Sequence, residues 1–267
     1  MNVPKIAREG LRSVGKLFSP KGAQEDTLEA LWPDRGGSCI RNRGKSWLEA
    51  QVDLSIIIPC YNNAPYLRGC LDSVLGQKTG YSFEAVVIDD GSTDETPEIL
   101  KAYAANPRVR LLRQENQGHS GARNAGLSVC RGKYLLFHDS DDTLLPGSIQ
   151  ALLDCAFQND ADIAIGGYVC KDAAGNLTPG KTYSAGPVTD RECIPGMTCG
   201  KAFRRRLWAK LQFPLGYWYE DSVISQILLP MARRIYAIEA PVFAYLLNPQ
   251  GVSAASQGRP KSLESLY

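Results

Sequence analysis

The chain has 267 residues, of which 44% are hydrophobic and 22% are charged, and its formal net charge at pH 7 is +2. This length suits one large domain or two small ones with a buried core. The small net charge argues against an extensive nucleic-acid surface, which normally carries a strong basic excess, and we expect no nucleic-acid partner. No apolar run approaches the roughly 18 residues that a membrane span needs.

The first 50 residues differ from the rest. Residues 1–18 place apolar side chains at helical spacing with basic residues between them. Such a helix could bind the anionic surface of a membrane, or it could pack on the main domain. Residues 19–50 are rich in Gly, Pro and charge, which predicts a linker. The start lacks the apolar core of a signal peptide, and the cysteines are scattered, so we expect a cytoplasmic protein with reduced thiols. If residues 1–18 bind lipid, it would be peripheral on the inner membrane face.

From Asp53 onward, short apolar runs alternate with amphipathic stretches. The runs predict strands at 54–58, 83–89, 109–113, 133–139 and 161–167. The stretches between them predict helices at 64–77, 96–105, 120–130 and 146–158. This alternation predicts an α/β fold with a mostly parallel, Rossmann-like sheet flanked by helices, in a single large domain. After residue 168 the alternation fades, and we expect a helix at 222–229 with strands at 234–240 and 242–247.

Polar clusters follow three of the predicted strands: "PCYNN" after the first, "DDGSTD" after the second and "HDSDD" after the fourth. In a parallel sheet the carboxyl ends of the strands share one edge, and ligands bind there. The sequence therefore predicts a functional site at this edge.

The third cluster places Asp139, Asp141 and Asp142 within four positions. Like charges about 4 Å apart repel by roughly 1 kcal/mol in water, and a helix cap would need only one of them. Asp139 and Asp141 can present their carboxylates on one side, which suits a hard divalent ion, Mn²⁺ or Mg²⁺. The stretch "LLFHDSDDTLL" also resembles the haloacid dehalogenase-type phosphatase motif. That motif stands on the first strand of its domain, whereas three strands precede it here.

The motifs "SIIIPCYNNAPYLRGCLDSVLGQ", "VVIDDGSTDET", "NQGHSGARNAGL", "GKYLLFHDSDD" and "YED" stand in the order found in family 2 glycosyltransferases. Over residues 53–253 the chain resembles the bacterial members that build surface polysaccharides. The resemblance implies a GT-A fold, an NDP-sugar donor (with UDP the expected nucleotide), a divalent cation and inversion at the anomeric carbon. It also implies a glycan or lipid-linked acceptor. Residues 51–167 would then bind the nucleotide-sugar, and residues 168–267 would bind the acceptor and end in a helix that the sequence cuts short.

The resemblance also assigns roles to individual residues. Those expected around the nucleotide-sugar are Pro59, Tyr61, Asn62, Asp89, Asp90, Arg123 and Asp139. Asp139 and Asp141 would form the metal-binding D-x-D pair, with Asp141 the principal ligand. In the "ED" pair, Glu220 precedes Asp221, which would act as general base. An inverting transfer needs such a carboxylate to take the proton of the attacking hydroxyl.

The sequence departs from the family pattern at two places. Asn63 stands where an acid is frequent. Leu246, Leu247 and Asn248 stand where the family usually has Tyr-Arg or His, residues that help to hold the diphosphate. A non-catalytic nucleotide-sugar-binding subunit therefore stays open as an alternative to an active transferase.

Overall fold

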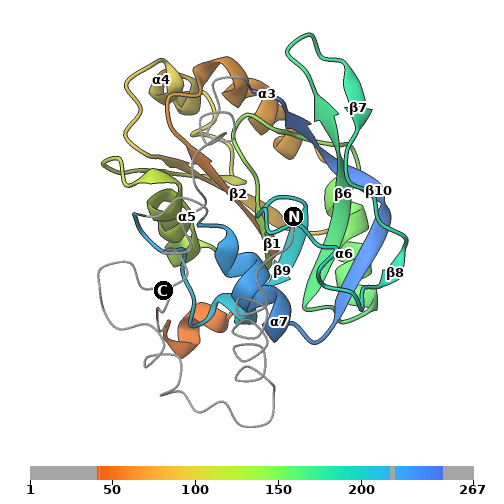
Figure 1. Cartoon of the computed structure of the whole chain (residues 1–267). Coiled ribbons are helices and arrows are strands. Elements are labelled where there is room, and N and C mark those ends of the chain that lie inside the picture. The colour runs from red at the N-terminus through yellow and green to blue at the C-terminus, as the bar shows by residue number, and fades with distance from the viewer. Residues whose placement is uncertain (1–40, 42, 217–219, 249–267) are drawn as a thin grey trace.

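The computed structural model describes residues 41, 43–216 and 220–248. A mixed β-sheet runs through the molecule with helices on both faces, which confirms the predicted α/β fold (Figure 1). Its strands are β1 (Val52–Cys60), β2 (Phe83–Asp89), β3 (Val109–Arg113), β4 (Gly132–Phe137), β5 (Thr143–Leu144), β6 (Ile163–Lys171), β7 (Leu177–Pro179), β8 (Gly186–Pro187), β9 (Lys201–Arg204) and β10 (Ile235–Leu246). The α-helices are α3 (Ala64–Leu75), α4 (Thr96–Lys101), α5 (Gly118–Val129), α6 (Ser148–Gln158) and α7 (Leu229–Met231).

The strand order is β3-β2-β1-β4-β9-β6-β10-β5, with β7 paired to β6 and β8 paired to β10. Strands β1 to β4 are parallel, as predicted. Strand β9 runs antiparallel between β4 and β6, which makes the sheet mixed. The carboxyl ends of β1, β2 and β4 therefore lie side by side at one edge.

Two apolar cores cover the two faces of the sheet. In β1 successive side chains alternate, so Ile56 and Ile58 face the core built with α3, α4 and α6, while Ile57 faces the core built with α5. All three are fully buried. Burial on both faces explains why β1 reads as a continuous apolar run.

Helix α5 lies unusually close to the sheet. A Cβ at Gly126 would stand 2.5 Å from Cγ2 of Ile57 and 2.9 Å from Cδ1 of Ile88. Real Cβ atoms do not approach other atoms so closely, so this position accepts only the hydrogen of glycine.

Several elements differ from the sequence predictions. Helix α4 ends at Lys101 rather than 105, because the next amides bond to carbonyls three residues back instead of four. The two strands expected at 234–247 are one strand, β10, whose pairing with β6 shifts register around Pro241. The helix expected at 222–229 is present, but most of it is the π-helix η3 (Ile224–Leu228), which continues into α7. Strand β9 was not predicted at all.

Residues 43–48, which include the 3₁₀ turn η1 (Lys45–Leu48), form a strap against the main domain. Trp47 Nε1 donates to the carbonyl of Leu127 at 2.8 Å. The guanidinium groups of Arg205 and Arg43 lie 4.2 and 4.9 Å from the centroid of the Trp47 ring. The strap thus joins α5 to the 3₁₀ turn η2 (Arg205–Trp208) that follows β9.

Residues 1–18, predicted to be amphipathic, and the expected C-terminal helix lie outside the described residues. None of the helices in the described part of the chain combines the length and hydrophobicity that crossing a membrane would require.

Candidate active site

The loops after β1 and β2 are joined by Asn62. Its Oδ1 accepts from the backbone amide of Thr93 at 2.8 Å, and the backbone amide of Asn62 donates to Ser92 Oγ at 3.0 Å. The backbone of Asn62 has φ 47°, a conformation that asparagine tolerates better than most residues. Beside it the side chain of Tyr61 is 50% exposed, whereas Pro59 is buried within β1. Tyr61 and Asn62 thus border the strand-end edge.

Asp89 and Asp90 end β2 and are both buried. Asp89 accepts from the amide of Ser92 at 2.9 Å and pairs with Arg113 at 3.3 Å. Asp90 accepts from Gln114 Nε2 at 2.7 Å and from the amide of Gln117, at the start of α5, at 3.0 Å. Both carboxylates therefore help to hold the loops of this edge in place.

Arg123, in α5, connects the two acidic motifs. Its Nη2 donates to Asp139 Oδ1 at 3.0 Å, and its Nη1 donates to Glu220 Oε1. Burial disfavours the charged guanidinium, but the two carboxylates outweigh it and raise the pKa of Arg123. Burial likewise opposes ionisation of Asp139, yet Arg123 holds its pKa below the ordinary value. The pairing brings together residues that lie 97 positions apart in the sequence.

The loop after β4 offers ligands for a hard cation. Asp139 and Asp141 are only partly buried, and burial together with Asp139 raises the pKa of Asp141. A divalent ion would offset this repulsion, and carboxylate oxygens are the ligands that Mg²⁺ and Mn²⁺ prefer. The residues present therefore fit such an ion.

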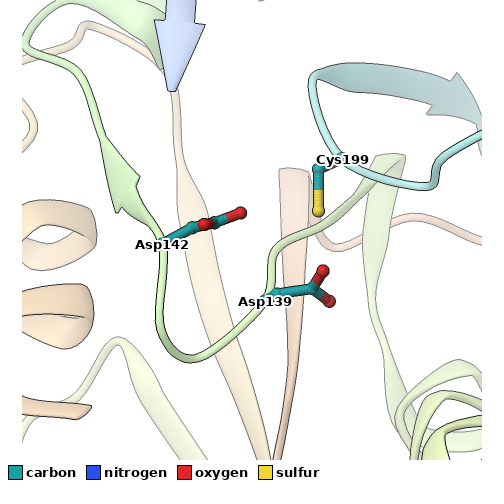
Figure 2. Close-up of side chains that lie close together, drawn as sticks. All are labelled: Asp139, Asp142 and Cys199. Atoms are coloured by element: carbon teal, nitrogen blue, oxygen red, sulfur yellow. The ribbon is translucent and has the colours of Figure 1, made fainter. Parts of the chain in front are cut away.

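Asp142 and Cys199 extend this group inward. Figure 2 shows their side chains and that of Asp139 turned toward one space, with Cys199 coming from the segment before β9, and their ligand atoms lie within 4.8 Å of one another. Asp142 Oδ1 accepts from the amide of Leu246 at 2.9 Å, while its buried Oδ2 has no partner. Burial raises the pKa of the Cys199 thiol well above its usual range, so it is protonated. Sequence reasoning did not include Asp142 or Cys199 in the site.

Asp221 lies next to Glu220, just before the π-helix η3. Burial and the charge of Glu220 raise the pKa of Asp221. Short π-helical turns are frequent at functional sites. The aromatic residues just before the "ED" pair, Tyr217, Trp218 and Tyr219, lie outside the described residues.

Lys201, on β9, is a further site residue that the sequence did not indicate, because the strand itself was not predicted. It is buried, and its Nζ donates to the carbonyls of Met197 at 2.7 Å and Cys199 at 3.4 Å. Burial lowers its pKa to about 8, and the nearby charge of Asp221 opposes this shift. Lys201 thus contributes positive charge behind Asp221.

The segment after β10 approaches the same loop. Leu246 holds Asp142 through its amide, and a hydrogen bond from Asn248 favours the charged form of Asp141. Residues 242–248 contain no basic side chain. Where the family usually has Tyr-Arg or His, this chain therefore places the backbone amide of Leu246 against Asp142 and the side chain of Asn248 against Asp141.

Comparisons with known proteins identify the family of the chain. The family model "Glycosyl transferase family 2" matches residues 55–210. The uncharacterized glycosyltransferase YibD of Escherichia coli is 33% identical over 79% of this chain and 66% of its own length. The glycosyltransferase GlyG of Streptococcus pneumoniae is 40% identical over 72% of this chain and 70% of its own length. Another relative, GlyA of Streptococcus pneumoniae, is matched over 31% of its length, so the chain spans only part of some relatives.

The structure is similar to that of Staphylococcus aureus TarS in complex with UDP-GlcNAc, with a TM-score of 0.65 and 23% sequence identity. The match covers 76% of this chain and 61% of that one, and it supports the GT-A fold. The family model covers more than half of the chain and includes the motif residues from Pro59 to Asp142. The chain therefore belongs to glycosyl transferase family 2.

Proposed function

We propose that this chain transfers a sugar from an NDP-sugar, with UDP as the nucleotide, to a glycan or lipid-linked acceptor of a surface polysaccharide. The reaction would invert the anomeric carbon and depend on Mn²⁺ or Mg²⁺. The observation that carries the proposal is the contact of Arg123 with both Asp139 and Glu220, because it brings the expected metal ligand and the expected base segment to one place.

The chain's own residues would perform distinct tasks. Asp139 and Asp141 would hold the cation, which neutralises charge on the departing diphosphate. Tyr61 and Asn62, on the exposed rim, would contact the nucleoside, and Asp90 would help to hold the base or ribose. Asp221 would accept the proton of the acceptor hydroxyl as that oxygen attacks.

The raised pKa of Asp221 supports this last role. A carboxylate whose pKa is raised binds the transferred proton more strongly, which suits a general base. The relatives YibD and GlyG are both described as glycosyltransferases, and TarS was solved with UDP-GlcNAc, which supports a UDP-sugar donor.

The direct test measures UDP release from a panel of UDP-sugars by the purified chain, with Mn²⁺ and an extract of bacterial glycan acceptors. We expect release to stop with EDTA and to return with added Mn²⁺ or Mg²⁺. Asp221→Asn should lower it by about 10²–10⁴-fold while UDP binding, measured by calorimetry, remains. Release that continues in EDTA would contradict the metal role, and normal turnover by Asp221→Asn would contradict the base assignment.

The second candidate function is a nucleotide-sugar-binding subunit without catalysis. The observation that favours it is the absence of a basic side chain in residues 242–248. UDP binding with no transfer to any acceptor would support it. The phosphatase interpretation is left without support, because three strands precede β4 and the family model matches a glycosyltransferase.

A cytoplasmic location, peripheral on the inner membrane face through residues 1–18, belongs to the same proposal. Its support is the basic amphipathic pattern of these residues. Vesicle co-sedimentation of the full chain and of a chain lacking residues 1–18 would test it.

A further inference from the structure

The contacts of Arg123 differ from those expected of a residue that meets the nucleotide. Its side chain is 5% exposed, whereas those of Asp139 and Glu220 are 33% and 18% exposed. The guanidinium thus lies behind the two carboxylates. A molecule entering from solvent would meet the carboxylates first.

The residues around Arg123 fix its direction. Its guanidinium carbon lies 5.5 Å from the centroid of the Phe213 ring. Phe213 is held in turn by the next residue of α5, since Asn124 donates to its carbonyl and accepts from its amide, both at 2.8 Å. Consecutive residues of one helix therefore support the guanidinium and aim it at the carboxylates.

Stability alone is a poor explanation for this arrangement. The Nε of Arg123 is buried without a partner, and burying a charged group costs free energy that ion pairs often only just offset. Unsatisfied buried groups are uncommon in folded proteins and call for an explanation, of which a functional role is one. An arginine is also required chemically, because its planar fork can bond two carboxylates at once, whereas a lysine offers a single point charge.

We propose that Arg123 is a positioning residue, which ties the base-bearing segment at Glu220 to the cation-binding loop at Asp139 and so sets the place of Asp221 relative to the donor. The inference rests on the proposed function. It adds that the two motifs depend on each other through one side chain, and that Arg123 competes with a bound cation for the charge of Asp139.

This proposal predicts opposite effects on cation binding. Arg123→Met removes the competing charge from Asp139, so Mn²⁺ should bind several-fold more tightly in the presence of UDP. Glu220→Gln leaves Arg123 with Asp139 as its sole anionic partner, so Mn²⁺ should bind more weakly. Both variants should lose about 10²-fold in kcat with little change in donor KM, because the base is displaced while the donor contacts remain.

The experiment compares Arg123→Met, Arg123→Lys, Glu220→Gln and the double variant by calorimetry with UDP and Mn²⁺, by kcat and KM, and by thermal unfolding. Arg205→Met is the matched control, because Arg205 is also a buried arginine but donates to the carbonyls of Gly132 and Cys130, so its loss lowers the melting temperature without touching either carboxylate. We expect the control to leave Mn²⁺ affinity unchanged, Arg123→Lys to restore folding but not kcat, and the double variant to lose no more kcat than either single variant.

Additive losses of kcat in the double variant, or Mn²⁺ affinities that do not move in opposite directions, would overturn the proposal. If the wild-type chain transfers no sugar, the proposed function fails. The opposite shifts in Mn²⁺ affinity would then still decide whether Arg123 links the two motifs.

Discussion

The strap at residues 43–48 should contribute measurably to stability through a single side chain, Trp47. Its indole N–H donates to the carbonyl of Leu127, which is worth about 1 kcal/mol, and the contacts of its ring with two guanidinium groups add about 1–2 kcal/mol. We therefore expect Trp47→Ala to lower the free energy of unfolding by about 2–3 kcal/mol. Trp47→Phe keeps an aromatic ring but loses the donor, and should cost about 1 kcal/mol.

Urea unfolding of the full chain measures these differences. Leu48→Ala is the matched control, because Leu48 is 46% exposed in the same strap and should cost less than about 0.5 kcal/mol. UDP binding should be the same in all three variants, since the strap contacts α5 and η2 and none of the site aspartates. If Trp47→Ala costs no more than Leu48→Ala, or no more than Trp47→Phe, the strap does not stabilise the domain in the way argued.

Three other predictions follow from the site and the core. Asp221→Asn should lower kcat by about 10²–10⁴-fold with unchanged UDP affinity in calorimetry, and a smaller loss would mean that another group takes the proton. Because burial and Glu220 raise the pKa of Asp221, the base becomes protonated, and kcat falls on acidification, at a pH above about 3.9, the usual pKa of Asp. Glu220→Gln should move this acidic fall in kcat to lower pH. A fall at or below pH 3.9 in the wild-type chain would contradict the assignment. Gly132→Ala should strongly lower the melting temperature, because the added Cβ would lie 2.2 Å from the backbone nitrogen of Ser55. Gly69→Ala is the control and should not lower it, because the space around Gly69 is open. Equal melting temperatures of the two variants would refute this account of the packing.

The strands that the sequence predicted best are those buried on both faces. Strands β1 and β2 each contain a continuous apolar run, at 56–60 and 85–88, because α-helices cover both sides of the sheet, and that pattern is local. Strand β9 escaped prediction because its four residues, "KAFR", are too few to show a period. β10 was divided because Pro241 usually ends a strand, whereas here the sheet absorbs it through a shift in register.

The site shows the same limit. The motif residues at the ends of β1, β2 and β4 could be grouped from the sequence, because the topology of a parallel sheet fixes which strand ends meet. The pairing of Arg123 with Glu220 could not, since it depends on how the segment after β9 returns to α5. Lys201 was missed for a similar reason, because its burial follows from a strand that inserts between two others.

The close contact of α5 with the sheet has a consequence for the whole site. The start of this helix bonds Asp90, its second turn bonds Asp139 and Glu220, and its third turn is pressed onto Ile57 and Ile88 at Gly126. A side chain at Gly126 would push the helix off the sheet and draw the Gln117 amide and the Arg123 guanidinium away from all three acidic groups together. The relative positions of the site residues therefore depend on the buried face of α5, at a glycine that has no polar side chain and does not face solvent.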